Sequence, residues 1–450
     1  MRSNIRVVLD LGASKIAGVM VELLADGTVN LLALASMPSQ GIRRGTVVDI
    51  ETAVQAIDQL FEDMEDMADL PIKSCRAGYS GTISSLSNRA IITIGHGEHE
   101  ITDEDIRRAI SAARTVAVPP DRSVLHLIPR MYSVDGYEGI VDPHGMIGSR
   151  LEVEVLMVTA ATNALQNLVR TIQRGGVRVK EIVANGLLVA DAVLLMEEKE
   201  MGVAVIDFGA ETCDIAMYIA GTAVFTSVVP IGGEFITRDL AVGLRTTLQE
   251  ARNLKEEYGL ALPPGSPELI DPHEEQPAFD FDSAEERLEG NSEIEENIEI
   301  ELPEELEEED HFVDVVNVYG NETRKISKQL IYNIIRARVE EILEMLDNEL
   351  KGSGYGGMLP AGIVLTGGTS NLKGIVPFCE EYLGIPFRKG VPENIPGIPN
   401  EYCIAENAAL LGAVIYGDKL TSKPASEETN QELAADRLFS RFWRWLREFF

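Results

Sequence analysis

Two short turns in the sequence pair an aspartate with a glycine directly after a run of apolar residues. The first reads Asp10-Leu11-Gly12-Ala13-Ser14-Lys15, and the second reads Asp207-Phe208-Gly209-Ala210-Glu211-Thr212. Turns of glycine and small residues expose backbone N–H groups that can surround a phosphate, and Lys15 adds a positive charge. Both aspartates are suited to hold Mg²⁺ beside those phosphates through water. One such turn predicts only a hairpin, whereas two predict that phosphates are gripped from opposite sides.

A third turn follows the apolar run Ile363-Val364-Leu365-Thr366 and reads Gly367-Gly368-Thr369-Ser370-Asn371. Because two glycines leave the backbone bare, a nucleoside can lie against it where the next helix is expected to begin. A related pair, Gly232-Gly233, precedes a helix expected over 235–242. Together the turns predict a nucleotide site.

The elements that must position these turns repeat along the chain. The segments around Asp10 and Asp207 both read as a buried strand, a turn and a returning strand, which predicts two similar halves. Apolar residues at helical spacing over 49–67, 163–174 and 326–350 favour an α/β fold. Residues 75–159 read as an insertion, with strands expected near 90–94, 124–128 and 151–158. A helix in that insertion should begin after Thr102, with Asp105 in the capping-box position.

Composition sets the class of protein. A chain of 450 residues with 45% hydrophobic content predicts two or more globular domains. Its four cysteines lack C-x-x-C spacing, which argues against a disulfide framework or a structural zinc site. No apolar run reaches the ~18 residues of a membrane span, and a net charge of −34 argues against nucleic-acid binding. Residues 266–310 carry 20 acidic residues and one basic residue, which predicts a mobile loop. This loop is a solvated spacer, a contact for a basic partner or a guard against nonspecific contact with anionic lipid.

The last fourteen residues combine aromatic, leucine and arginine side chains at helical spacing. On one face fall Leu438, Phe439, Phe442, Trp443, Trp445, Leu446, Phe449 and Phe450, and on the other Arg437, Arg441, Arg444 and Arg447. Such a helix is typical of one lying in a membrane interface, with its arginines on anionic headgroups. The alternative, a terminal helix docked on the protein's own core, is disfavoured because residues 421–430 read as a flexible tether.

The three turns resemble the two phosphate loops and the adenosine loop of the actin, Hsp70 and sugar-kinase superfamily. Within that superfamily, residues 5–417 are similar to the FtsA family. The phrases that carry this resemblance are Leu125-His126-Leu127-Ile128-Pro129, Asp142-Pro143-His144-Gly145-Met146 and Val228-Val229-Pro230-Ile231-Gly232-Gly233. The resemblance implies a duplicated RNase H-like α/β fold of the actin/Hsp70 type, with two lobes around a nucleotide cleft and an FtsA-type inserted subdomain.

The same resemblance implies a division of the chain. Subdomain 1A is expected at 1–82 and 161–199, an inserted SHS2-like subdomain 1C at 83–160, and subdomain 2A at 200–245 and 356–417. Subdomain 2B, with the acidic loop 266–310, is expected at 246–355. A flexible linker at 418–436 and a membrane-targeting amphipathic helix at 437–450 would follow.

By resemblance, the chain would bind ATP or ADP with Mg²⁺ and assemble into filaments. It would tether FtsZ, through the FtsZ C-terminal tail, to the anionic cytoplasmic membrane at the division site. Lys255 would lie near the adenosine, and Arg338 and Glu341 would contact the FtsZ tail. Other divisome proteins would bind the inserted subdomain. The ordinary interpretations, a solvated helix lysine and an i,i+3 surface pair, remain open.

Two positions depart from the family pattern. Glu211 stands where the family often has glycine, and it would bring negative charge to the phosphate loop unless it points away. Asn185 stands where an acidic residue followed by proline is common. Asparagine can orient a water but cannot accept its proton. We therefore expect weak ATP hydrolysis at most, with the nucleotide acting mainly as a conformational ligand.

Two other functions compete with this interpretation. A pilus-assembly relative shares the nucleotide turns and the inserted subdomain, and the C-terminal helix is the main feature that argues against it. A small-molecule kinase of the same superfamily would need a catalytic aspartate base in a substrate cleft, and the sequence offers no convincing candidate.

Overall fold

The computed structural model describes residues 4–95, 99–114, 118–263, 266, 311–320, 322–393 and 395–417. The membrane-helix prediction at 437–450, the linker at 418–436 and nearly all of the acidic segment lie outside these residues.

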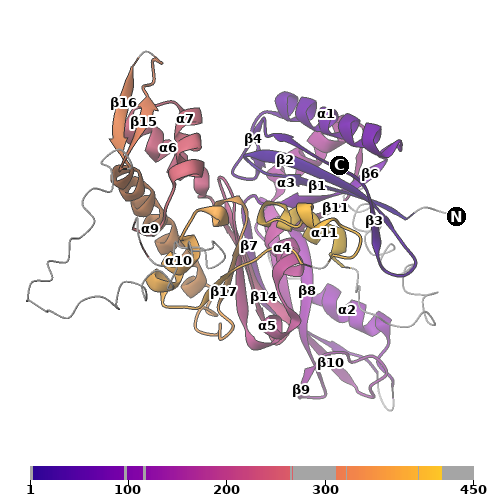
Figure 1. Cartoon of the computed structure of the whole chain (residues 1–450). Coiled ribbons are helices and arrows are strands. Elements are labelled where there is room, and N and C mark those ends of the chain that lie inside the picture. Colours follow the sequence, from indigo (N-terminus) through magenta and orange to yellow (C-terminus); the bar gives the residue numbers. More distant parts are fainter. Residues whose placement is uncertain are drawn as a thin grey trace, which may run out of the picture.

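Two lobes, each built on a five-stranded sheet, face each other, and a smaller four-stranded sheet extends below the first lobe (Figure 1). The mixed α/β class predicted from the sequence is confirmed.

The first lobe is built on the sheet order β11-β6-β1-β2-β3. Its strands are β1 (Ile5–Leu11), β2 (Lys15–Leu23), β3 (Val29–Pro38), β6 (Ser74–Tyr79) and β11 (Arg178–Ala184). The first three strands are antiparallel, whereas β6 and β11 continue the sheet in parallel. Helices α1 (Ile50–Ala68) and α3 (Thr162–Arg174) pack beside this sheet. The side chain of Asp49 caps α1, so the helix expected over 49–67 is confirmed to within one residue.

The second lobe repeats this plan with the order β14-β13-β12-β17-β18. Its strands are β12 (Val203–Phe208), β13 (Cys213–Ile219), β14 (Thr222–Val229), β17 (Ile363–Thr366) and β18 (Phe387–Lys389). Again three antiparallel strands are extended by two parallel ones. The two Asp-x-Gly turns therefore occupy equivalent places, between β1 and β2 and between β12 and β13. The duplication predicted from the sequence is confirmed.

Helices and one hairpin complete the second lobe. The helices are α6 (Gly233–Leu244), α7 (Leu248–Tyr258), α9 (Lys328–Gly352) and α10 (Ile375–Leu383), and the hairpin pairs β15 (Phe312–Val316) with β16 (Thr323–Ser327). Ile326 belongs to β16 instead of the helix expected from 326, because the Ser327 side chain caps α9 at Leu330 N. After the Gly-Gly turn the chain forms only a 3₁₀ turn, Gly368–Asn371, and α10 begins after Gly374, whose φ is +74°.

The inserted sheet has the order β7-β10-β8-β9. It comprises β7 (Ile83–Thr93), β8 (Arg122–Val134), β9 (Tyr137–Ile140) and β10 (Arg150–Ala161), with α2 (Asp103–Ala113) packed against β7 and β10. The predicted capping box of Thr102 and Asp105 is present at the start of α2. Ser85 of β7 exchanges two hydrogen bonds with the backbone of Thr226 in β14. Because β8 also packs against β11 of the first lobe, the insertion contacts both lobes.

The chain passes between the lobes beside two helices that pack on each other, α4 (Asn185–Val193) and α11 (Ala408–Ile415). Their backbones touch at Gly412, where an added Cβ would lie 1.9 Å from the carbonyl oxygen of Leu188. The short helix α5 (Met196–Met201) follows α4 and leads into the second lobe. Because α4 and α11 connect the lobes, their close packing fixes the base of the cleft.

Two arginines hold the end of α11. Arg6 of β1 donates to the carbonyl oxygen of Val414. Arg76 of β6 donates to the carbonyl oxygens of Ala413 and Tyr416 at 2.7 and 2.9 Å. Positive groups at a helix C-terminus satisfy its free carbonyls and complement its dipole. Within the ranges described, no helix is both long and apolar enough to cross a membrane.

Candidate nucleotide site

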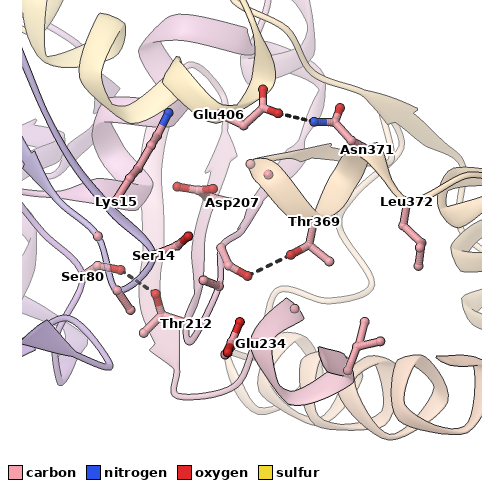
Figure 2. A pocket seen from close by; sticks show the side chains of 18 of the residues that line it. Ser14, Lys15, Ser80, Asp207, Thr212, Glu234, Thr369, Asn371, Leu372 and Glu406 are labelled. Carbon is pink, nitrogen blue, oxygen red and sulfur yellow. Dashed lines mark hydrogen bonds between the residues drawn. The ribbon is translucent and has the colours of Figure 1, made fainter. Parts of the chain in front are cut away.

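A cavity of about 530 Å³ lies between the two lobes. Its size falls within the range typical of sites for small molecules and cofactors. Fifteen of the residues predicted for a nucleotide site line it: Asp10, Gly12, Ala13, Ser14, Lys15, Asn185, Asp207, Gly209, Ala210, Thr212, Gly233, Lys255, Gly367, Gly368 and Asn371. Figure 2 shows the side chains of several of these residues converging from different elements on one space.

The two Asp-x-Gly turns have matching geometry. An added Cβ on Gly12 would lie 2.8 Å from the carbonyl oxygen of Lys15, and one on Gly209 would lie 2.9 Å from that of Thr212. Each hairpin therefore closes too tightly for a side chain at its glycine. The N–H of Gly209 donates to the carbonyl oxygen of Thr212 at 2.9 Å, so an anion at the second turn would be bound by N–H groups of its other residues.

Three carboxylates line the cavity beside the two Asp-x-Gly turns: Asp10, Asp207 and Asp214. Asp207 and Asp214 are direct cross-strand partners in β12 and β13, where like charges repel. Desolvation raises the pKa of Asp207 to about 7, with a further contribution from Asp10. Burial likewise raises the pKa of Asp10 and, strongly, that of Asp214. Burial and mutual repulsion therefore disfavour full ionisation of this cluster, and a cation beside it would favour ionisation.

The polar atoms around these carboxylates fit a hydrated cation. Asn185 donates from Nδ2 to Asp10 Oδ1 at 3.2 Å, but its own Oδ1 and the Oδ1 of Asp214 are buried without a hydrogen-bond partner. Within the described ranges, no group of three or more His, Cys, Asp or Glu side chains is arranged to hold a metal ion directly. Carboxylate and amide oxygens such as those of Asp10, Asp207 and Asn185 are of the kind that hold hydrated Mg²⁺.

The two predicted lysines lie on opposite sides of the cavity. Lys15 donates to Asn407 Oδ1 at 3.0 Å, so its ammonium group is turned toward the start of α11 (Figure 2). Lys255 donates to Thr237 Oγ1 at 2.9 Å and to the carbonyl oxygen of Gly233 at 3.2 Å. Burial lowers the pKa of Lys255. Lys255 thus lines the cavity beside the Gly232-Gly233 turn and is not a solvated surface lysine.

The third glycine turn forms the other end of the cavity. The φ of Gly367 is +85°, and an added Cβ there would lie 2.2 Å from Asp207 Oδ1. Thr369 donates to the carbonyl oxygen of Gly209 at 3.0 Å, so the third turn is tied to the second (Figure 2). Asn371 is held by Glu406 and by Lys389. Bare backbone beside Leu372 and Ile236 suits a flat apolar ring such as a nucleobase.

Sequence reasoning missed several lining residues: Ser80, Asp214, Glu234, Ile236, Arg252, Glu256, Gly259, Thr369, Leu372, Lys373, Glu406 and Ala409. Asp214 had a usable signal, because a hairpin that starts at Asp207 returns an acidic residue directly opposite it. Ser80 follows the end of β6, which is parallel to β1, and it donates to Asp214. The others come from turns and helix ends whose proximity depends on the lobes being packed together.

Two predicted residues do not line the cavity. Gly232 lies just behind it, where an added Cβ would lie 2.5 Å from the carbonyl oxygen of Gly209. Glu211 does not line the cavity and is paired with Arg43 and Arg238. The negative charge expected at this turn is therefore directed away from the cavity, toward these two arginines.

The predicted partner residues lie on α9, apart from the cavity. Arg338 donates from Nε to Asp239 at 2.5 Å and from Nη1 to Glu341 at 2.5 Å. These three side chains form one ion-paired group that joins α9 to α6. Burial is moderate for Arg338, whereas Glu341 is exposed.

Two family models match the sequence. One, described as "SHS2 domain inserted in FTSA", matches residues 80–159, and the other, "Cell division protein FtsA", matches residues 204–412. A relative described as "Cell division protein FtsA" from Neisseria meningitidis is 34% identical, with 98% of each chain covered. Its counterpart from Pseudomonas aeruginosa is 32% identical, with 98% of this chain and 97% of the relative covered. The Bacillus subtilis relative is 31% identical, over 96% of this chain and 89% of its own.

Solved structures show the fold. The "PilM-PilN type IV pilus biogenesis complex" matches with a TM-score of 0.58 at 16% identity, over 91% of this chain and 97% of that one. MreB 5 of Spiroplasma citri, bound to AMPPNP, matches with a TM-score of 0.50 at 12% identity, over 93% of this chain and 97% of that one. At such identities the likeness establishes the fold alone. The chain has the actin-like fold, as predicted.

Proposed function

The chain belongs to the family of the cell division protein FtsA, and from that membership we propose that it is an ATP-binding membrane adaptor. In this proposal the protein polymerises and tethers filaments of the division protein FtsZ to the inner face of the cytoplasmic membrane. The observation that carries the nucleotide part is the pair of Asp-x-Gly turns that face one cavity of about 530 Å³. A nucleotide of one or more phosphates fits between those turns and the third glycine turn.

Within the site, each group has a defined task. Backbone N–H groups of the two Asp-x-Gly turns bind phosphate oxygens, and Gly367-Gly368 lies against the nucleoside. Asp10 and Asp207 would hold Mg²⁺ through water, and the ion would supply neutralisation of phosphate charge. Asn185 orients a water without accepting its proton. Weak hydrolysis is therefore expected, and the nucleotide acts chiefly by holding the lobes together.

The membrane part of the proposal rests on residues 437–450. Their arginine-faced, aromatic-rich pattern matches an interfacial helix, and the linker before it supplies reach. A body with a net charge of −34 is repelled by an anionic surface. Attachment must then come from the tail, whose apolar face and arginines overcome this repulsion locally.

Vesicle pelleting tests the adaptor directly. With MgATP and vesicles containing anionic lipid, the full-length chain should pellet, whereas a chain ending at Asp418 should stay in the supernatant. Raising salt should weaken pelleting, because the arginine contacts are screened. A full-length variant with Trp443→Ala and Trp445→Ala gives the matched control and should lose most binding. Equal pelleting of the full-length and shortened chains would contradict the proposal.

We place the FtsZ-tail site on α9, at Arg338 and Glu341. Arg338→Glu should weaken binding of a peptide with the FtsZ C-terminal sequence at least tenfold, because charge reversal also repels Asp239. Fluorescence anisotropy with labelled peptide measures this. Arg336→Glu, on the same helix but paired with Glu340, serves as control and should change affinity little. If both variants bind the peptide as the unchanged chain does, the site lies elsewhere.

Assembly into filaments, binding of other divisome proteins to the inserted sheet and localisation at the division site belong to the same proposal. A pilus-assembly role is the alternative, and the chain of the "PilM-PilN type IV pilus biogenesis complex" has the same fold. The vesicle experiment separates the two, because the alternative gives the C-terminal helix no membrane task.

A further inference from the structure

Glu211 joins the two lobes beside the phosphate-binding turn. Its side chain is 5% exposed. Its carboxylate accepts hydrogen bonds from Arg43 Nη1 at 3.2 Å, from the backbone N–H of Arg44 at 2.9 Å and from Arg238 Nη2 at 2.5 Å. Arg43 and Arg44 belong to the first lobe, whereas Glu211 and Arg238 belong to the second. One buried carboxylate therefore bridges the cleft.

An aromatic ring reinforces this bridge. The guanidinium carbons of Arg44 and Arg238 lie 5.5 and 5.3 Å from the centroid of the Phe235 ring, within cation–π range. Phe235 lies in the first turn of α6, two residues after Gly233, which lines the cavity. We call Glu211, Arg43, Arg44, Arg238 and Phe235 the Glu211 clasp.

The first-lobe half of the clasp is a strained hairpin. Strands β4 (Ile42–Arg43) and β5 (Thr46–Val47) are joined by Arg44-Gly45, with φ values of +46° and +66°. Such a two-residue turn favours Asn-Gly, and the left-handed region is unfavourable for arginine. Strain of this kind persists where the surroundings hold it and points to a functional constraint. Here the constraint is the N–H that Arg44 presents to Glu211.

The hairpin is also fixed to the wall of the cavity. An added Cβ on Gly45 would lie 2.2 Å from the carbonyl oxygen of Ser80. Ser80 Oγ lies 3.0 Å from Thr212 Oγ1, next to Glu211 in the phosphate-binding turn (Figure 2). The hairpin, the wall residue Ser80 and the second turn are thus linked, so the clasp cannot open without disturbing the phosphate end of the cavity.

We propose that Glu211 is a positioning residue that holds the two lobes closed and thereby slows the release of bound nucleotide. This inference rests on the proposed nucleotide binding. In the closed arrangement the Glu211 carboxylate accepts from Arg43, the Arg44 N–H and Arg238. Opening the lobes removes the first two of these three donors, which costs free energy. Nucleotide leaves from the open state, so the release rate follows the population of that state.

Release of a fluorescent ATP analogue, chased by excess ATP with Mg²⁺ present, measures the effect. Glu211→Gln should speed release about tenfold, since loss of charge-assisted hydrogen bonds favours the open state. Arg43→Gln should act in the same direction and add little in the Glu211→Gln background. Glu340→Gln is the matched control, because its carboxylate bonds Arg336 within α9 of one lobe. Release by Glu211→Gln within twofold of the unchanged chain would overturn the proposal.

A second measurement needs no nucleotide. Dyes at Glu62→Cys on α1 and at the 84% exposed Tyr319→Cys, between β15 and β16, report the separation of the lobes, because α1 belongs to the first lobe and the β15–β16 hairpin to the second (Figure 1). Cys403→Ser removes the partly exposed native thiol, and the other three cysteines are buried. Energy transfer should fall in Glu211→Gln and not in Glu340→Gln.

The two measurements separate the two proposals. If the unchanged chain binds no nucleotide, the nucleotide proposal fails, while the dye separation still decides whether Glu211 closes the lobes. Equal energy transfer in all variants would overturn the clasp. Should Glu211→Gln fail to fold in a melting test, Arg43→Gln carries both measurements, because the Arg43 side chain is 64% exposed.

Discussion

Asp207→Asn should raise the melting temperature of the nucleotide-free protein at pH 8 and abolish tight binding of MgATP. The folded-state pKa of Asp207 is raised to about 7 by desolvation and by Asp10. Because the folded state holds this proton more tightly than the unfolded state, the carboxyl's contribution to the free energy of unfolding is fully present below the unfolded-state pKa of 3.8. That contribution is lost as pH rises through about 7. Asparagine removes this loss, which we expect to be at least about 1 kcal/mol.

Melting curves between pH 4 and pH 8, with calorimetric titration of MgATP, measure both effects. The two proteins should melt alike near pH 4 and diverge as pH rises, while affinity for MgATP falls about 100-fold. Asp135→Asn is the opposite-sign control, because hydrogen bonds from Ser149 lower the pKa of Asp135. An Asp207→Asn variant that melts below the unchanged chain at pH 8 would show that the cluster carries no such penalty.

Gly412→Ala should be among the most destabilising single substitutions in the chain. The new methyl group would lie 1.9 Å from the carbonyl oxygen of Leu188 and 2.5 Å from its carbon, and this backbone cannot rotate away. Helices α4 and α11 must then separate, at a cost of about 3 kcal/mol. Because both helices lie where the lobes connect, nucleotide affinity should fall as well.

Thermal and urea melting measure the loss. Gly352→Ala is the matched control, since it makes the same change in α9 where no atom lies within 4 Å of the new methyl group. That variant should be neutral or slightly more stable, because alanine favours the helix by about 1 kcal/mol over glycine. Equal melting of both variants would mean that α4 and α11 tolerate separation.

What the sequence predicts well here is local. The Asp-x-Gly turns, the caps of α1 and α2, and the duplication all follow from short patterns of residues, because backbone sterics and capping act over a few positions. From these features, more than half of the residues that line the cavity are predicted correctly. They also identify the α/β class without any knowledge of packing.

What the sequence does not predict is side-chain direction across the cleft. The Glu211 side chain turns away from the cavity because Arg43 and the Arg44 N–H donate hydrogen bonds to it, and Arg43 is 168 residues away in the chain. Ser80 joins the site only because β6 lies parallel to β1. A 3₁₀ turn after Gly367 replaces the expected helix start, and Thr369 within it donates to the carbonyl oxygen of Gly209, 160 residues away. Tertiary contacts decide each of these cases, and no local pattern encodes them.

The grip of Arg6 and Arg76 on the end of α11 has a mechanical consequence. Chain beyond Gly417 begins directly after the carbonyls that these two arginines hold. A pulling force on that end is therefore resisted by charge-assisted bonds to the central strands β1 and β6. The same force acts along the helix that packs on α4 through Gly412. Tension on the C-terminal end is thus transmitted to α4 and α11, where the lobes connect, and would change the angle between the lobes.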